Sequence, residues 1–407
     1  MKFAHMADIH LGATSEPRLR EFEISTLTKA FQICIERDVD FIIISGDLFH
    51  VNIPDLSIVK EAVRIMKKFV ENGKNIYVVY GSHDYSPNAT SIVDILDEIG
   101  IIKRVGKPSF SEGKLRPEVI IDKSGAIITG MSGRKLSLEK EYFKYLDREY
   151  LSSLKGYKIF VFHSAIEELK KKGEYYEGIA STDLPEGFDY YAGGHIHRRI
   201  EYLGKIFYPG PLFTGWGTDL ENTVKGERRG FFIVNNGKVE FIDLTPFQGI
   251  YKEFDATGLS ALELNNRIRS FIENTDIKNK VVVLKVFGEL VRGTTSDVEF
   301  TKIREEIMKK GALYLHLNRS QLKSREFEGA TPIGEDINKI EEEIFKEAIA
   351  YKKFNELKLI KEGVNLSKIL FNQLRVQKKE GERQVDYERR MKEAAIEVLG
   401  IRELLIG

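Results

Sequence analysis

The chain has 407 residues and carries 62 Lys and Arg against 62 Asp and Glu, so its formal net charge is zero. This length allows a catalytic domain with one or two smaller units, and an apolar fraction of 42% supplies a large core. Zero net charge excludes a protein coated in basic charge for tight, unaided nucleic-acid binding, but allows a local basic groove or a partner that supplies affinity.

The N-terminal segment MKFAHMADIHLG lacks the sustained apolar stretch of a signal peptide, and no later segment has the length of a membrane span. The single cysteine, Cys34, lies in the apolar pattern AFQICI, so a disulfide within the chain is excluded and a buried thiol is expected. We therefore expect a cytoplasmic protein in which any bound metal uses His and carboxylate ligands rather than thiolate.

In the first half, short apolar runs alternate with helical patterns. The expected strands are residues 2–7, 40–47, 75–81 and 158–164, and the early helices include 31–35 and 57–70. This layout predicts an α/β fold in which sheet is packed between helices. From residue 198 to 245 the pattern is typical of hairpins, with Asn236-Gly237 at a tight turn.

A second, smaller α/β unit follows. Helical spacing is found at 260–272 and 298–309, and strands are expected at 280–288 and 312–318. The polar run 318–335 indicates a linker, and charged amphipathic helices are expected at 336–359 and 382–399, with a shorter one at 366–374. The predicted domains are a catalytic domain 1–247, a capping domain 248–320, a linker 321–335 and a helical module 336–407.

Aspartates and histidines recur where the predicted strands end. They are Asp8, His10, Asp47, His83, Asp84, His163, His195 and His197. The carboxyl ends of strands in an open α/β sheet share one edge, where ligands collect. A lone histidine there is usually a capping or solvated residue, and Asp47 alone could merely start a turn. Together, however, these motifs place short ligands on glycine-containing turns from which they can converge.

Imidazole and carboxylate together suit manganese, iron or zinc, whereas Mg²⁺ alone prefers an oxygen-rich shell. Two metals that share one carboxylate are an economical arrangement for this many ligands. Such pairs lie about 3.5–4 Å apart, activate a water and clamp the attacking and leaving oxygens of a phosphoryl group. The motifs therefore predict a metal-dependent phosphoesterase.

The spacings D-x-H, G-D, G-x-H-D, H and G-H-x-H resemble the calcineurin-like metallophosphoesterase superfamily. The segments MKFAHMADIHLG, DFIIISGDLFH and YPGPL resemble its SbcD-like branch, the double-strand-break repair nucleases of the meiotic-recombination-eleven type. The resemblance implies a sandwich of two sheets flanked by helices, a small α/β capping domain and a C-terminal helical tail. It covers nearly the whole chain, although the cap and tail match by layout only.

Carried over by position, the resemblance assigns Asp8, His10 and His197 to one metal. It assigns His163 and His195 to the other, with Asp47 bridging. His83 corresponds to a non-ligand histidine that stabilises the phosphate and the leaving oxygen, a role that suits an imidazole.

His50 matches a second non-ligand histidine, associated with exonuclease activity and substrate-end positioning. A solvated turn residue is the alternative interpretation of His50.

One position departs from the family pattern. The family's third motif is G-N-H-D, whose Asn is a ligand of the second metal, but this chain has Gly81-Ser82-His83-Asp84. A serine hydroxyl is shorter and a weaker donor, so the second metal is expected to bind more loosely, to take a water instead, or to sit slightly shifted. Alternatively, Ser82 is only a turn residue and Asp84 bonds the backbone.

The resemblance further implies two Mn²⁺ per chain, 3′-to-5′ exonuclease action on duplex DNA ends and endonuclease action on single strands. It implies docking of the C-terminal helices on the coiled-coil base of an SbcC-like (rad-fifty-type) ATPase, and a homodimer formed through helices near 57–70 and 91–99. From the residues alone, those helices could equally cover the sheet, and the tail could pack back on the body.

Basic residues beside the motif loops are candidate phosphate contacts, or else solvated surface residues. They are Arg18, Arg20, Arg198, Arg199, Lys225, Arg228 and Arg229. Two other functions stay open beside a DNA nuclease. One is a general metallophosphoesterase on small phosphoesters, although the cap and tail favour a macromolecular substrate. The other is a DNA-end-binding scaffold with impaired catalysis, supported only by Ser82.

Overall fold

The computed structural model describes residues 1–84, 90–171, 176–324, 357–379 and 384–400, together with Phe345, Lys346, Ile349 and Glu382. The chain divides into two units, Met1–Lys323 and Ser324–Gly407. All of the Asp and His motifs lie in the first unit.

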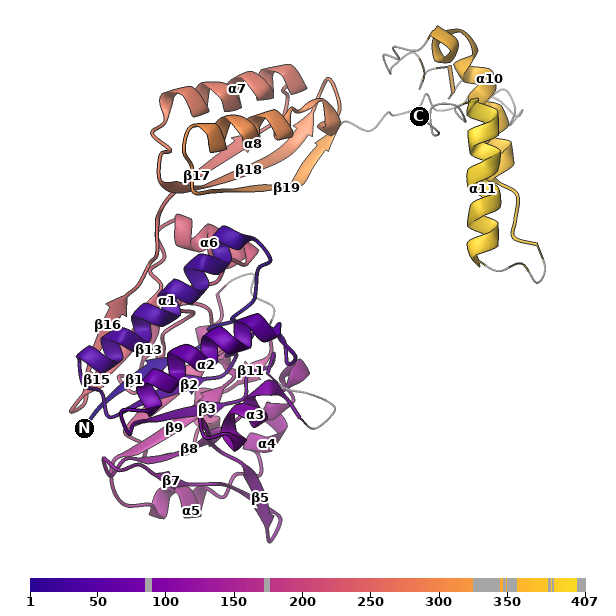
Figure 1. Ribbon diagram of the computed structural model, residues 1–407. Coiled ribbons are helices and arrows are strands. Elements are labelled where there is room, and N and C mark those ends of the chain that lie inside the picture. The colour runs from indigo at the N-terminus through magenta and orange to yellow at the C-terminus, as the bar shows by residue number, and fades with distance from the viewer. Residues whose placement is uncertain are drawn as a thin grey trace. The chain divides into compact units, whose positions relative to one another are not determined.

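Two six-stranded sheets form the centre of the motif-bearing part of the first unit (Figure 1). The first has the order β16-β15-β1-β2-β3-β4, and the second has the order β13-β14-β12-β9-β8-β7. The strands of the first are β1 (Lys2–Met6), β2 (Phe41–Ser45), β3 (Asn75–Val79), β4 (Lys103–Arg104), β15 (Gly230–Asn235) and β16 (Lys238–Asp243). Those of the second are β7 (Ile120–Ile121), β8 (Ile127–Met131), β9 (Lys158–His163), β12 (Tyr190–Gly194), β13 (Ile200–Tyr202) and β14 (Ile206–Tyr208).

The two sheets face each other across an apolar layer. Phe41 and Tyr77 from the first sheet pack in one buried cluster with Val161 and Tyr190 from the second. Strands β1, β2 and β3 are parallel, as are β8, β9 and β12. The strands that carry the motifs therefore end at a common edge in each sheet.

Helices cover the outer faces of both sheets. The outer face of the first sheet packs in another buried cluster with α1 (Pro17–Glu36), α2 (Leu56–Val70) and α3 (Ile92–Glu98). The second sheet packs with α4 (Glu139–Phe143) and α5 (Arg148–Ser153). Polar residues fix where these helices start: the Asp55 carboxylate accepts a hydrogen bond from the Ser57 amide at α2, and Ser91 forms a capping box at α3. The expected sandwich of two sheets flanked by helices is confirmed.

The remaining short elements of this part are strands and 3₁₀ turns in the connections. They are β5 (Pro108–Ser111), β6 (Lys114–Pro117), β10 (Ala165–Ile166), β11 (Gly178–Ile179), and the turns Lys135–Ser137, Glu167–Leu169 and Ser181–Asp183.

The region 198–245 contains the two expected hairpins and one helix that the sequence did not suggest. Strands β13 and β14 pair antiparallel, and β15 and β16 meet at the Asn236-Gly237 turn, where both residues have positive φ. Between the hairpins lies α6 (Gly217–Val224). It is only two turns long, and aromatic and glycine-rich segments on both sides hid its helical spacing.

A three-stranded sheet with two helices on one face forms the cap. Its elements are β17 (Gln248–Asp255), α7 (Ala261–Asn274), β18 (Lys280–Leu290), the 3₁₀ turn Thr295–Asp297, α8 (Phe300–Lys309) and β19 (Tyr314–Ser324). Val281 and Val283 on the other face contact Leu220 and Val224 of α6. Strand β19 runs past residue 321, where a linker was expected, because the buried Leu322 continues the apolar pattern of the strand.

The C-terminal unit contains α10 (Leu357–Leu374) and α11 (Gln384–Leu399) (Figure 1). Helix α11 matches the expected 382–399, whereas α10 begins nine residues before the expected 366–374. The expected helix 336–359 lies almost entirely outside the described residues, as does the segment 325–335. Every helix in the described part of the chain is too short or too polar to cross a lipid bilayer.

Candidate metal centre

The site begins with two loops that follow β1 and β2. The Asp8 amide donates to the Gly46 carbonyl at 3.1 Å, and the His10 amide donates to the Asp47 carbonyl at 2.9 Å. Asp8, His10, Asp47 and His195 all have φ between 48° and 93°. Backbone strain of this kind costs about 1–3 kcal/mol per residue and concentrates at functional sites. The residues that carry these four side chains therefore have strained backbone conformations, as is typical of a functional site.

Two glycines let the loops approach closely. A Cβ at Gly81 would collide with the Asp47 carboxylate, and one at Gly194 would collide with the Ser45 carbonyl. The glycines in the G-x-H-D and G-H-x-H motifs are therefore steric requirements of the site.

One group of candidate ligands, the first cluster, consists of Asp8, His10 and His197, whose ligand atoms lie within 4.8 Å of one another. The Nε2 atoms of His10 and His197 are 3.1 Å apart, and His10 Nε2 is 3.6 Å from Asp47 Oδ2. On its other side, His197 Nδ1 lies 2.7 Å from Asp219 Oδ2. Because an ionised carboxylate only accepts, Nδ1 carries the proton and Nε2 faces the cluster.

The second cluster consists of Asp8, Asp47 and His163, again within 4.8 Å. His163 Nδ1 donates to the Ser45 carbonyl at 2.8 Å, so Nε2 is left to face Asp47 Oδ2 at 3.3 Å. Asp47 thus contacts a histidine of each cluster. This is the position that the resemblance gave to a bridging carboxylate.

Burial dominates the electrostatics of both clusters. It raises the pKa of Asp8 to about 6, and it lowers the pKa of His195 to about 3 and that of His10 well below its usual value. Burial would also raise the pKa of Asp47, but the neighbouring His163 and His10 lower it overall. His163 itself is desolvated, yet the Asp47 charge raises its pKa to about 10. The carboxylate that joins the clusters is therefore held ionised.

These residues fit divalent metal ions. Among the described residues, Asp8 Oδ2 is buried without a hydrogen-bond partner, and His163 Nε2 is buried with only its ion-pair contact to Asp47 at 3.3 Å. A buried polar atom left unpaired costs about 1–3 kcal/mol. A cation among these oxygen and nitrogen donors would offset that cost, and the donor set suits manganese, iron or zinc.

A third group of rings, the histidine face, lies beside the first cluster and consists of His10, His50 and His83. The rings of His50 and His83 are stacked at 4.9 Å between centroids. His83 Nδ1 lies 2.6 Å from the His50 carbonyl, so this nitrogen donates, and the His83 amide donates to Asp47 at 2.8 Å. The structure thus brings both predicted non-ligand histidines to the site.

The G-x-H-D turn is held by its aspartate. Asp84 is buried, and its carboxylate accepts from the amides of Gly81, Leu48 and Phe49. Burial, with the nearby Asp47 charge, raises the pKa of Asp84 to about 7. Ser82 lies half-buried in this turn. Asp84 does bond the backbone, as one sequence interpretation held, and a ligand role for Ser82 stays a prediction.

His195 joins none of the candidate clusters found among the described residues, although its ring centroid is 5.2 Å from that of His163. Its amide donates to Asp8 Oδ1 at 2.8 Å, so this residue contributes its backbone as well. Its assignment as a ligand of the second metal stays a prediction.

Sequence reasoning missed Asp219 and misjudged Arg229. Asp219, on α6, orients His197 and also accepts from the Thr214 hydroxyl. Arg229 is buried and donates to Thr223, to the Asp219 carbonyl and to the His197 carbonyl. It is therefore not a phosphate contact. No local pattern signals either role, because both depend on α6.

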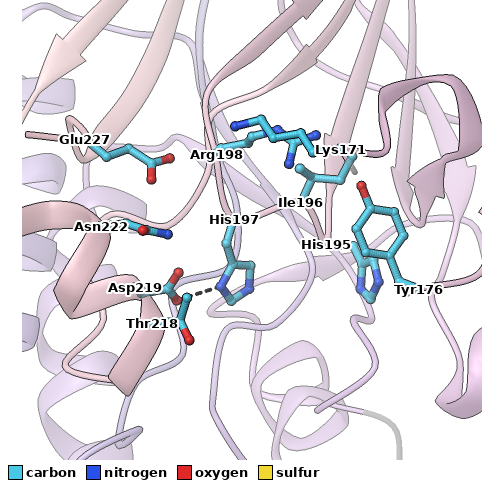
Figure 2. A pocket seen from close by; sticks show the side chains of 10 residues that line it. All are labelled: Lys171, Tyr176, His195, Ile196, His197, Arg198, Thr218, Asp219, Asn222 and Glu227. Carbon is cyan, nitrogen blue, oxygen red and sulfur yellow. Dashed lines mark hydrogen bonds and ion pairs between the residues drawn. The ribbon is translucent and has the colours of Figure 1, made fainter. Parts of the chain in front are cut away.

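A pocket of about 360 Å³ opens beside the two histidines of the G-H-x-H motif (Figure 2). Figure 2 shows the His197 ring between Asp219 and His195, with Tyr176 beyond His195. Its lining residues are Lys171, Tyr176, His195, Ile196, His197, Arg198, Thr218, Asp219, Asn222 and Glu227. The pocket joins the metal-ligand candidates to basic and aromatic side chains.

The sequence pattern of the calcineurin-like phosphoesterase family matches residues 1–199, which include the strands that carry the motifs and all the residues of the clusters. Residues 1–199 thus carry a calcineurin-like phosphoesterase domain.

Relatives identify the branch. The chain is 31% identical over 302 residues to the DNA double-strand break repair protein Mre11 of Methanococcus maripaludis, a match that covers 71% of this chain and 73% of that protein. The Mre11 protein of Methanocaldococcus jannaschii is 28% identical, with 75% and 77% covered, and that of Archaeoglobus fulgidus is 30% identical, with 65% and 63% covered. The chain belongs to the Mre11 family, and the resemblance seen in its motifs is confirmed.

Proposed function

We propose that the chain is a two-metal phosphodiesterase that cleaves DNA in double-strand-break repair. The observation that carries the proposal is Asp47, an ionised carboxylate that contacts His10 at 3.6 Å and His163 at 3.3 Å. The names of the Mre11 relatives support DNA as the substrate and repair as the process.

Asp8, His10, Asp47 and His197 would hold one metal, and Asp47, His163 and His195 the other, with Ser82 a candidate additional ligand. Bound divalent ions, which we take to be two Mn²⁺, would supply an activated water and clamp the phosphate oxygens. The donor set of imidazole and carboxylate supports manganese over magnesium.

His83 is the proposed general acid. Its Nδ1 donates to the His50 carbonyl, so Nε2 is the atom that would deliver a proton to the leaving oxygen. His50 stacks on His83 and, through that carbonyl, orients the ring. This pair supports a role for His50 in placing the substrate end.

We propose two cleavage activities: 3′-to-5′ exonuclease action on duplex ends and endonuclease action on single strands. The pocket beside His195 and His197 supports a nucleotide-sized substrate, since Lys171 and Arg198 line it. A small phosphoester would need neither this pocket nor the cap.

The test compares single- and double-stranded oligonucleotides, labelled at either end, with a small chromogenic phosphodiester in the presence of Mn²⁺. We expect DNA to be cleaved far faster than the small diester, with products shortened from the 3′ end. Preference for the small diester would identify a general phosphoesterase instead. Binding of DNA without cleavage under any metal would identify a scaffold.

We also propose that the C-terminal unit docks on an SbcC-like coiled-coil ATPase. Helix α10 and the segment just after it have four partly exposed apolar side chains, each 39–47% exposed: Ile369, Phe371, Leu374 and Val376. Phe371 and Leu374 are three residues apart and lie on one face of α10, and apolar side chains spaced in this way are how a helix binds a partner groove. The Mre11 relatives support such a partner.

Removal of the residues after 335 tests this docking. We expect the truncated chain to cleave short DNA at the full-length rate and to lose association with the ATPase in a pull-down. The matched control is Phe371→Asp in the full chain, which should weaken association without altering cleavage. Loss of cleavage on truncation would contradict a separate docking module.

A homodimer is the third part of the proposal. Ile53 and Leu56, near the start of α2, are 77% and 79% exposed, and Ile95 and Ile99 at α3 are 49% and 58% exposed. Such an apolar surface is typical of an interaction site. Leu56→Glu should convert a dimer to a monomer in sedimentation, whereas Leu262→Glu, at a cap residue that is also largely exposed (68%), should not.

A further inference from the structure

Trp216 lies against the histidine face. It is the residue before α6, and its ring centroid lies 4.9 Å from that of His50, 6.2 Å from His83 and 6.3 Å from His10. It is therefore the fourth ring of a group that contains the proposed general acid. The sequence motifs did not include it.

The ring is firmly placed but only partly covered. The Trp216 carbonyl accepts from Leu220 in the first turn of α6, and the preceding Gly215 amide reaches the buried Glu23 carboxylate. Yet the side chain is 48% exposed, and a Cβ at Gly217 would meet nothing within 4 Å. About half of the largest apolar side chain in the protein thus faces open space beside the site.

An exposed indole beside His50 and His83, where the phosphate of a substrate would bind, matches the chemistry of nucleic-acid binding. Bases stack on aromatic side chains irrespective of sequence, because every base has a π-face. A phosphodiester held at the clusters carries a base on the neighbouring sugar, whereas a small phosphoester or an isolated phosphate brings none.

We propose that Trp216 contacts the substrate directly, stacking on the base of the nucleotide next to the scissile phosphate. The inference rests on the proposed nuclease function and specifies how the nucleotide is oriented there. If Trp216 instead served only to pack against His50, removal of the base from the substrate would not change the contribution of the ring.

The chain has a single tryptophan, so its intrinsic fluorescence reports on this position alone. The full-length, Mn²⁺-loaded protein is mixed in a stopped-flow instrument with a short thymine oligonucleotide, or with the same oligonucleotide made abasic throughout. At saturation, we expect the thymine oligonucleotide to quench the fluorescence at once, before cleavage, and the abasic one to leave it nearly unchanged. Equal quenching by both would overturn the proposal.

Steady-state cleavage kinetics test the stacking contact independently of the fluorescence measurement. On the thymine oligonucleotide, Trp216→Ala should raise KM about tenfold, the loss expected for one stacked base. Trp216→Phe should retain most of the wild-type KM. On the abasic oligonucleotide both variants should match the wild type. Phe110→Ala, at a 60% exposed aromatic residue on β5 and outside the motif loops, is the control that should change nothing.

A rise in KM of the same size on both oligonucleotides would also contradict stacking and indicate a purely structural ring. Failure of the proposed function is a different result: the wild type would cleave no oligonucleotide with Mn²⁺. The fluorescence measurement needs no cleavage, so the two failures are distinguishable.

Discussion

Asp47 contacts a histidine of each cluster, but the histidines of the two clusters are oriented by different means. In the first, the outer nitrogen of His197 donates to a carboxylate, Asp219, which is itself held by Thr214. In the second, the outer nitrogen of His163 donates to a neutral carbonyl, that of Ser45. A carboxylate partner raises the basicity of a metal-ligating histidine more than a carbonyl does.

The second cluster also has Ser82 where the family pattern has an amide ligand. Both differences act in one direction, so the first cluster should bind its metal more tightly than the second. The difference at Ser82 can be recognised in the sequence, whereas the contact between Asp219 and His197 is known only from the fold.

The largest effect is expected from a substitution that leaves both clusters intact. His83→Gln removes the proposed acid while retaining the backbone amide that donates to Asp47. We expect kcat on DNA to fall about 10²–10⁴-fold, the usual contribution of general acid catalysis. Calorimetric titration with Mn²⁺ should be unchanged, and a loss of either metal would mean that His83 is a ligand.

Protonation of Glu23, which contacts the first-motif loop, should make the stability of the fold depend on pH. This buried α1 carboxylate accepts from Gly12, in the first-motif loop, and from Gly215, before Trp216. Burial raises its pKa from 4.5 to about 7. The native state therefore gains stability from the bound proton below about pH 4.5 and loses it as the pH rises through about 7.

The free energy of unfolding of the wild type, relative to Glu23→Gln, should thus fall by about 3 kcal/mol between about pH 4 and about pH 8. Denaturant unfolding at both pH values measures this change. Parallel stability profiles for the two proteins would contradict a buried, protonated Glu23.

Asp219→Asn tests the first cluster alone. Loss of the charge on the partner of a metal-ligating histidine typically weakens metal binding about 10–100-fold. We expect that loss at one of two sites in a Mn²⁺ titration. Asp122→Asn, another buried carboxylate that bonds Tyr77 and Asn75 outside the site, is the matched control. A loss at both sites would remove the distinction between the clusters.

Ser82→Asn should have the smallest effect, and it should act on the second cluster. Restoring the amide is expected to tighten the weaker metal site several-fold and to raise cleavage at limiting Mn²⁺. If the titration and the rate both stay unchanged, Ser82 is only a turn residue and the asymmetry rests on Asp219 alone.

The sequence predicted the sandwich and the convergence of its Asp and His motifs because both follow from local patterns. Short apolar strands end near Gly, Ser, Asp or His, and the candidate ligands lie at or just after those ends. It did not predict the left-handed φ of Asp8 or Asp47, since that conformation results from hydrogen bonds between two loops distant in sequence.

Asp219, Arg229 and Trp216 escaped prediction for one shared reason. All lie on or beside α6, a two-turn helix whose contacts with His197 and His50 form only in the folded chain. A buried arginine and an exposed one have the same sequence signature, so Arg229 was grouped with surface basic residues.

Anomalous diffraction from Mn²⁺-soaked crystals would test the two-metal site, because it counts and locates the metals. We predict two peaks, one beside Asp8, His10 and His197 and the other beside His163, with Asp47 between them. At limiting Mn²⁺ the peak beside His197 should be the stronger. A single peak that Asp47 does not contact, or no peak at all, would contradict a shared-carboxylate, two-metal site.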